Sequence, residues 1–306
     1  MKAKREVLAS QVSLKRTQNN ERQLEQALSR FFKKLSKEVL DNLETYWSEY
    51  QLLQGQINLI IKPIMESEEE YNRILEKYIR REYKLGSAEA KRLVNLAMNR
   101  KAEKSIFDQL RKGVRIKATR YNLFGTLEEA EEELLTKVFT ASKRTLARIS
   151  TDINVLLTEG YTSGKGINVI ASVLEKRFNQ LETWEAKRIA RTEIHNAHNN
   201  AVMRTYETLN VEYTQWIAAD DDRTRESHLE VDREIIRIGD TYSNGLAYPG
   251  DTSGPIEEWI NCRCSNAPYV MPYGYTAPPG MTRFHEEDIV NNIVHPNKCS
   301  CHLCSG

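Results

Sequence analysis

The sequence has no cysteine among its first 261 residues, and it has no excess of charge of either sign. An odd number of cysteines gathered late in a chain is not typical of a disulfide framework, so it favours a reducing compartment and a metal site. The 44 Lys and Arg residues balance 43 Asp and Glu residues. Overall charge therefore gives no argument for binding nucleic acid or a membrane. The five cysteines are Cys262, Cys264, Cys299, Cys301 and Cys304.

Long apolar runs are also missing. A membrane-spanning helix needs a run of about 18 apolar residues, and none is present, so we expect no transmembrane helix and no membrane partner. No apolar segment follows the basic residues after Met1, so we expect no secretory signal. The 306 residues are 40% hydrophobic, which is enough to bury a core, and this length favours about two domains.

Residues 1–20 are an exception to the even distribution of charge. Five basic residues face Glu6 alone, a net charge of +4. We interpret the segment as a flexible basic arm. Either it is a solvated terminus, or it contacts double-stranded DNA non-specifically through the phosphates. The candidate DNA contacts are Lys2, Lys4, Arg5, Lys15 and Arg16.

Residues 21–182 are predicted to be mostly helical. Apolar residues recur there at steps of three and four, as on one face of a helix. The segment Gly160–Gly166 resembles a phosphate-binding loop, but it is one residue short and has Gly166 where a hydroxyl is required, so we interpret it as a helix stop and restart at Ile167. Capping boxes at Ser67–Glu70 and Thr126–Glu129 predict two helix starts. The first apolar stripe is Leu24, Leu28, Phe31, Leu35 and Val39.

The character of the chain changes after Asn210, where short strand-like segments replace helical periodicity. We therefore predict an α+β protein: an extended, mostly helical N-terminal region, a small α+β domain at 183–272 built on an Ala-rich helix, and an irregular Cys-rich tail at 273–306. The run Pro278-Pro279-Gly280 argues against regular structure in the tail. The predicted strands are Tyr213–Ile217, Glu234–Ile238 and Asn266–Met271.

Polar residues that are expensive to bury begin on the Ala-rich helix. Arg191 and Glu193 have two interpretations. They form a buried ion pair that ties the helix to the following sheet, or Glu193 is a general base or a metal ligand. His195 and His198 lie three residues apart, close enough to share a helical face as a metal pair, although surface histidines with this spacing are common.

A second polar group follows the first strand, where Asp221, Arg223, Arg225 and His228 crowd into a turn. They form a structural network of turn hydrogen bonds, or His228 acts as an acid or base. His228 could also bind zinc together with the Cys262–Cys264 pair, although Cys-x-Cys is a poorer knuckle than the two-residue spacing.

The C-terminal tail is dense in soft ligands, and Cys301 and Cys304 have the two-residue gap that zinc sites favour. Two interpretations stay open here, a zinc site and a frayed terminus with free thiols. The candidate ligands are His295, Cys299, Cys301, His302 and Cys304.

In their order, these motifs resemble the phage Mu F-like family, the minor head or head-morphogenesis proteins of tailed bacteriophages. One departure is visible, because Val231-Asp232-Arg233 stands where the family usually has Leu-Asp-Gly. The matching residues run Arg191-Thr192-Glu193, Trp216, Asp221, Arg223, Arg225 and His228, Tyr248-Pro249-Gly250-Asp251, and Asn261-Cys262-Arg263-Cys264.

The resemblance implies a virion protein, located in the head interior or at the portal vertex, and in the host cytoplasm during assembly. By itself it implies no enzymatic activity. It implies association with the oligomeric portal protein, with scaffold or major capsid protein as further partners, and a role in head assembly, genome packaging or ejection. Residues 21–182 are then the candidate portal-docking region, and the motif residues hold a loop-rich domain together. The alternative is a metal-dependent, nuclease-like enzyme that uses Asp221, His228, Cys262 and Cys264.

Overall fold

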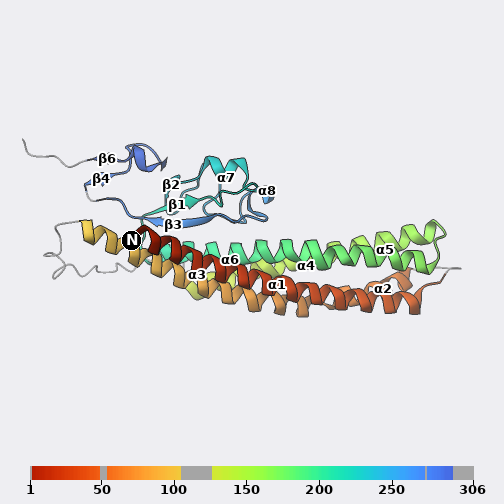
Figure 1. Cartoon of the computed structure of the whole chain (residues 1–306). Coiled ribbons are helices and arrows are strands. Elements are labelled where there is room, and N and C mark those ends of the chain that lie inside the picture. Colours follow the sequence, from red (N-terminus) through yellow and green to blue (C-terminus); the bar gives the residue numbers. More distant parts are fainter. Residues whose placement is uncertain (1, 49–53, 105–125, 273, 292–306) are drawn as a thin grey trace, which may run out of the picture.

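The computed structural model describes residues 2–48, 54–104, 126–272 and 274–291; for residues 2–14 and 99–104 it describes the backbone alone. A long helical bundle carries a small sheet domain on one side (Figure 1). A π-helical turn joins the last two helices into one continuous rod. The bundle consists of α1 (Lys2–Tyr46), α2 (Gln54–Glu66), α3 (Glu68–Lys104), α4 (Leu127–Thr162), α5 (Ile167–Gln180), the π-turn (Leu181–Glu185) and α6 (Ala186–Thr208).

The apolar stripes predicted from the sequence form the core of the bundle. Every member of the first stripe is at most 4% exposed, and one apolar cluster runs through all six helices. The rings of Phe31 and Tyr71 stack with their centroids 5.2 Å apart, which joins α1 to α3. Burial of these side chains, rather than helix propensity, supplies most of the stability of such long helices.

The predicted helix boundaries after residue 120 are confirmed. Thr126 forms a complete capping box: its hydroxyl accepts from the Glu129 N–H at 3.2 Å, and the Glu129 carboxylate accepts from the Thr126 N–H at 2.6 Å. Helix α4 ends at Thr162 and α5 starts at Ile167, with Gly164 at a φ of +64° in the turn between them. Helix α3 does start after Ser67, but the Ser67 hydroxyl donates to the Ile64 carbonyl rather than capping α3.

The sheet domain contains a four-stranded antiparallel sheet with the strand order β3-β1-β2-β5. A separate pair, β4 with β6, follows it. The predicted α+β class is confirmed. The elements are β1 (Tyr213–Ile217), α7 (Glu226–Glu230), β2 (Ile235–Arg237), α8 (Ile256–Trp259), β3 (Ser265–Tyr269), β4 (Tyr275–Thr276), β5 (Arg283–Phe284), a 3-10 turn (Glu286–Asp288) and β6 (Val290–Asn291).

Two parts of the predicted organisation are wrong. Residues 2–20 are not a flexible arm, because α1 begins at Lys2 and buries Thr17 and Asn20 against α3. Residues 274–291 are not irregular throughout, because β5 extends the main sheet and buries Phe284 beside Tyr213. The run Pro278-Pro279-Gly280 lies in the loop between β4 and β5, where it interrupts no strand.

Helix α6 connects the two parts, since it packs within the bundle and also lies along the sheet (Figure 1). Side chains of its sheet-facing side bind the loops of the sheet domain: Asn199 donates to the Cys264 carbonyl at 3.0 Å, and Asn200 donates to the Tyr248 hydroxyl at 2.9 Å. The Ala-rich helix α6 therefore belongs to the bundle and also forms the base of the α+β domain. No helix among the described residues is long and apolar enough to cross a bilayer.

Gly86 on α3 lies in close contact with α6, and its replacement by alanine should destabilise the protein. A Cβ atom there would lie 2.6 Å from the His198 carbonyl oxygen and 3.1 Å from the Ala201 Cβ. Overpacking of this kind costs about 1–3 kcal/mol, although alanine in a helix interior otherwise gains about 0.5–1 kcal/mol over glycine. Urea unfolding measures the change. The control is Gly55→Ala on α2, where a Cβ would meet nothing within 4 Å; equal stability of both variants would contradict the close packing.

Candidate functional site

The turn after β1 is organised by Asp221. Its carboxylate accepts from the Arg223 N–H at 3.0 Å and the Thr224 hydroxyl at 3.2 Å, which closes an Asx turn. Arg263, on the loop before β3, forms a two-pronged hydrogen-bonded ion pair with the same carboxylate. This pairing holds the pKa of Asp221 well below its usual range. The Arg223 side chain is 66% exposed, so it contributes little to the site.

Three soft ligand atoms meet beneath this turn. His228 on α7 places its Nδ1 atom 3.8 Å from the Cys262 Sγ and 3.4 Å from the Cys264 Sγ. The three side chains are only 1–2% exposed, and both thiols are free. Among the described residues they form the only group of His, Cys, Asp and Glu side chains close enough together to hold a metal ion. Asp221 does not belong to this group. The enzymatic alternative placed four residues in one site, and its inclusion of Asp221 is wrong.

The surroundings of His228 fix its orientation. The ring packs edge-on against Trp216, with centroids 5.1 Å apart, and Trp216 packs in turn on Tyr242 at 5.1 Å. The His228 Nε2 atom lies 3.0 Å from a Glu258 carboxylate oxygen, although not in the alignment of a hydrogen bond. Glu258 also accepts from the Ser227 hydroxyl at 2.9 Å. Nδ1 therefore faces the two sulfur atoms and Nε2 faces a carboxylate.

The two thiols are electrostatically unequal. The interaction of the two neighbouring thiols raises the pKa of Cys262 and lowers the pKa of Cys264, and burial raises the pKa of Cys262 further. The hydrogen bond and charge of His228 also favour the Cys264 thiolate. Cys264 is therefore the member of the pair that more readily forms a thiolate.

The remaining motif residues fasten the loops around this cluster. Arg225 donates to the Ile260 carbonyl. The buried Asp251 accepts from the Ser253 N–H at 2.9 Å and the Ala247 N–H at 3.2 Å. Asn261 adopts a φ of +56° and donates its N–H to the Thr192 hydroxyl on α6 at 3.1 Å. These contacts fit the predicted structural network.

The predicted ion pair of Arg191 and Glu193, which would tie the helix to the sheet, is not formed. Arg191 donates instead to Glu21 on α1 at 3.0 Å, because it lies on the bundle side of α6. Glu193 keeps partial solvent access, but burial of its carboxyl group raises its pKa to about 7. That pKa would suit a general base, yet Glu193 lies outside the ligand cluster of the described residues.

His195 and His198 do not form a metal pair, because each faces a different glutamate in the bundle. The His195 Nε2 atom is 3.5 Å from Glu21, and the His198 Nδ1 atom is 3.0 Å from Glu82. Burial acts to raise the pKa of both glutamates, but the hydrogen bonds and charges of their partners, the histidines first, outweigh it, so both values are lowered. These contacts form a polar layer that joins α1, α3 and α6.

Two sets of predicted residues are only partly covered by the structure. Of the DNA-contact candidates, Lys15 and Arg16 are exposed on α1, whereas the side chains of Lys2, Lys4 and Arg5 lie outside the described part of the chain. DNA contact stays a prediction. The candidate zinc ligands of the tail lie outside the described residues, and zinc binding there also stays a prediction; they are His295, Cys299, Cys301, His302 and Cys304.

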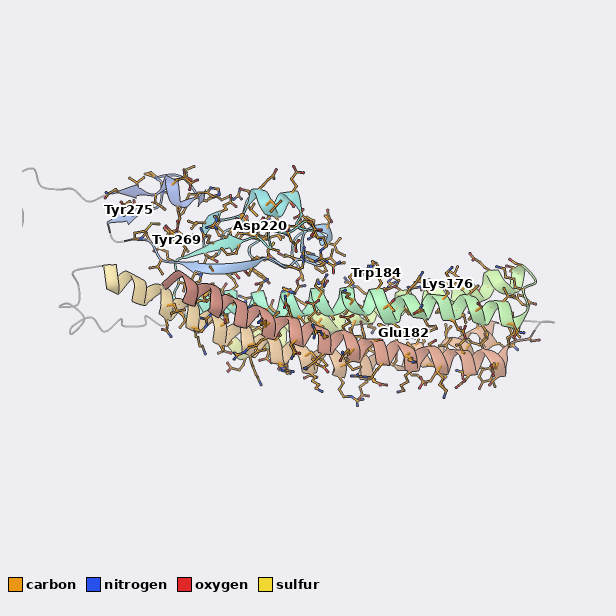
Figure 2. All side chains as sticks on the ribbon, viewed as in Figure 1. Lys176, Glu182, Trp184, Asp220, Tyr269 and Tyr275 are labelled. Carbon is orange, nitrogen blue, oxygen red and sulfur yellow. The ribbon has the colours of Figure 1, made fainter. Side chains whose placement is uncertain are left out.

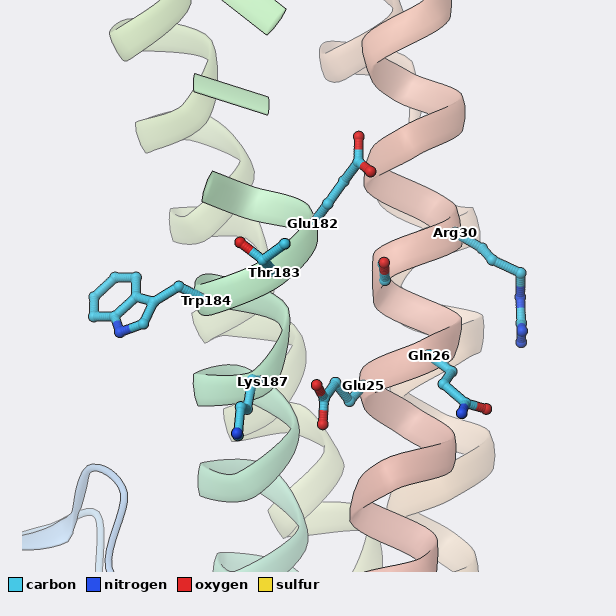
Figure 3. A pocket seen from close by; sticks show the side chains of 8 residues that line it. Glu25, Gln26, Arg30, Glu182, Thr183, Trp184 and Lys187 are labelled. Carbon is cyan, nitrogen blue, oxygen red and sulfur yellow. The ribbon is translucent and has the colours of Figure 1, made fainter. Parts of the chain in front are cut away.

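A groove on the surface of the bundle is a separate candidate site. It lies between α1 and the start of α6 and has a volume of about 660 Å³. Glu25 on α1 reaches toward α6 and Lys187 lies on α6 beside the groove, whereas Trp184 projects away from α1 (Figure 3). Trp184 lies on the π-turn, stacks with the Arg188 guanidinium at 4.4 Å and is 60% exposed. Exposed tryptophans and π-turns are both enriched at functional surfaces.

Sequence reasoning missed the residues that support the cluster from outside the motif. Glu258, Ser227 and Tyr242 carry no distinctive pattern. Asn199 and Asn200 gave a usable signal, because two adjacent amides on a helix of small residues have to find partners when they are buried.

Residues 151–267 match the family model described as "Phage Mu protein F like protein", and the resemblance predicted from the order of the motifs is thereby confirmed. The chain is also similar to "Minor head protein GP7" of Bacillus phage SPP1, at 28% identity over 130 residues. The match covers 40% of this chain and 42% of that relative, so the chain spans less than half of the relative's length. No solved structure matches the chain significantly.

Proposed function

We propose that the protein is a minor head protein of a tailed bacteriophage that acts in head morphogenesis and docks on the oligomeric portal through its helical bundle. The observation that carries the proposal is the family match over residues 151–267. Those residues form one connected unit, from the second half of α4 through α5, α6 and the sheet. The name of the phage SPP1 relative supports the same role.

The surface around Trp184 is the part of the bundle that we propose for docking. Trp184 projects from the side of the bundle that also carries the sheet domain (Figure 2). A large, exposed indole flanked by Arg188, Lys187 and Glu25 combines an apolar anchor with charges of both signs. Such combinations form the centre and the rim of protein interfaces. We propose that the protein is located at the portal vertex of the virion. Scaffold or major capsid protein is proposed as a further partner.

The nuclease-like alternative is not favoured by the geometry of the cluster. His228, Cys262 and Cys264 are at most 2% exposed, and the walls of their site are loops fastened to α6. A nucleic-acid strand would have to reach a metal-bound water to be cleaved. The buried arrangement therefore suits a structural role of these three side chains better than a catalytic one.

Docking is tested by substitutions on the surface, because cutting the chain at residue 182 would remove α6 from the bundle core. In a copurification assay with the portal oligomer, Trp184→Ala should weaken binding by about 2 kcal/mol or more, the range of an interface anchor. Circular dichroism and thermal unfolding should stay unchanged, since the side chain is mostly exposed.

Val169→Ala is the matched control for docking. Val169 is 51% exposed on α5, in the same continuous helix but outside the groove. This variant should bind the portal like the wild type. If wild-type protein fails to copurify with the portal, portal docking is wrong. If the wild type binds and both variants bind equally well, docking uses another surface.

A further inference from the structure

The geometry of the buried cluster matches a known coordination shell. Zinc binds sulfur at about 2.3 Å and nitrogen at about 2.0–2.1 Å, and at the tetrahedral angle these bonds place the two ligand atoms about 3.6 Å apart. The His228 Nδ1 atom lies 3.4 Å and 3.8 Å from the two sulfur atoms. All three ligand atoms lie within 4.8 Å of one another. One ion therefore reaches all three without rearrangement of the backbone.

The groups behind the three ligands also match a metal site. A histidine that binds a metal typically presents its other ring nitrogen to a carboxylate, which fixes the tautomer. Glu258 takes this position, 3.0 Å from the His228 Nε2 atom, and Ser227 holds the carboxylate in place.

The sheet domain has a physical need for such a site. Its core around Trp216 has few buried apolar side chains, and two of the cluster members are the cysteines themselves. Its strands are two to five residues long, and its helices α7 and α8 have five and four residues. Elements this short bury too little surface to be fixed in place by packing alone. Small domains with this composition are commonly stabilised by a structural metal.

We propose that His228, Cys262 and Cys264 bind one zinc ion that joins α7 to the loop before β3 and stabilises the sheet domain. Two thiolates and a neutral imidazole compensate the charge of a divalent cation and suit zinc among the available metals. No fourth His, Cys, Asp or Glu side chain of the described residues joins the cluster. The site is structural, since its ligands are buried. The proposal does not depend on the proposed function.

The test separates this site from the cysteines of the tail. In the full chain carrying Cys299→Ser, Cys301→Ser and Cys304→Ser, we expect about one zinc ion per chain after purification, measured by inductively coupled plasma mass spectrometry. Adding Cys264→Ser to that background should remove the zinc. Adding His285→Ala should not, because His285 belongs to the same domain but lies outside the cluster.

Cobalt gives a readout that does not require the Cys264→Ser chain to fold. Titrating Co²⁺ into the folded, tail-substituted chain should produce thiolate-to-cobalt charge-transfer absorption in the near ultraviolet and intense visible bands of a tetrahedral ion. Zinc should then abolish both. A tail-substituted chain that folds but holds no zinc and gives no thiolate–cobalt bands overturns the proposal. A chain that retains copper or iron in place of zinc overturns the choice of metal.

Glu258 is expected to act as a positioning residue for His228. In the tail-substituted chain, Glu258→Gln should weaken zinc affinity by about 10–100-fold in competition with a chromophoric chelator. Glu257→Gln is the control, because its side chain is exposed beside the same position. Equal zinc affinities of the two variants would remove Glu258 from the site.

Discussion

Replacing Trp216 by alanine should lower the free energy of unfolding by about 3–5 kcal/mol, the cost of emptying a buried tryptophan site. Trp216 is 0% exposed and is the largest fully buried side chain among the described residues. Its ring is the contact between His228 and Tyr242. Urea unfolding followed by circular dichroism measures the loss, and a separate early transition would show that the sheet domain unfolds before the bundle.

Two further tryptophan variants make the test of Trp216 specific. Trp216→Phe should cost less, because it keeps an aromatic ring and removes an indole N–H that has no hydrogen-bond partner. Trp184→Ala should change stability by about 0.5 kcal/mol or less, as is usual for surface positions, since Trp184 is 60% exposed. The uncertainty of a free energy of unfolding extrapolated from urea is about 1 kcal/mol. If the free energy of unfolding of Trp216→Ala differs from the wild-type value by less than this, the domain repacks around the cavity.

The parts of the fold that could be predicted from the sequence are those with local causes. The stripe that begins at Leu24 follows from helical periodicity, and the Thr126 capping box needs only residues three positions apart. The stop and restart around Gly164 also follows from the local sequence. In each case the residues that decide the structure lie within one or two turns of it.

The parts that could not be predicted depend on partners far away in the sequence. Residues 1–20 look like a solvated arm because their polar side chains have no local partners. In the fold, Thr17 and Asn20 bind Glu82. Arg191 likewise pairs with Glu21 rather than with a residue of the sheet. A strand of two residues such as β5 is too short to show any periodicity, so the continuation of the sheet beyond residue 273 had no signal.

The residues of the candidate site could be predicted from the sequence, but which of them lie together in the fold could not. Trp216, His228, Cys262 and Cys264 were singled out by the order of the motifs, and the structure brings these four together. Asp221 stood in the same run, yet Arg263 binds it away from the thiols. Spacing along a turn does not determine which side of the turn each side chain occupies, so this division required the fold.

Removal of the buried carboxylate of Glu82 should have the second large effect. Glu82 is 0% exposed, accepts from Thr17 at 2.7 Å and from Asn20 at 2.8 Å, and lies 3.0 Å from the His198 Nδ1 atom. Glu82→Ala would remove the acceptor of the buried Thr17 hydroxyl, one of the two acceptors of the buried Asn20 amide, and the partner of the partly buried His198 ring. Breaking a buried ionic network from one side costs about 3–5 kcal/mol. Urea unfolding should show that loss, whereas Glu69→Gln on the same helix should cost about 0.5 kcal/mol or less, because its ion pair with Arg73 is exposed.

The pH dependence of Glu82→Gln distinguishes the charge of Glu82 from its shape. Burial alone would raise the pKa of Glu82, but His198 on α6, with Thr17 and Asn20 on α1, outweighs burial and lowers the pKa below the ordinary value of 4.5. A carboxyl group with a lowered pKa contributes stability that is fully present above its ordinary pKa and is lost as the pH falls through the folded value. Wild-type protein should therefore be more stable than Glu82→Gln at neutral pH, and this advantage should shrink as the pH falls below 4.5. A stability difference between the two proteins that stays constant from neutral to acidic pH would show that Glu82 acts as a hydrogen-bond acceptor whose charge is immaterial.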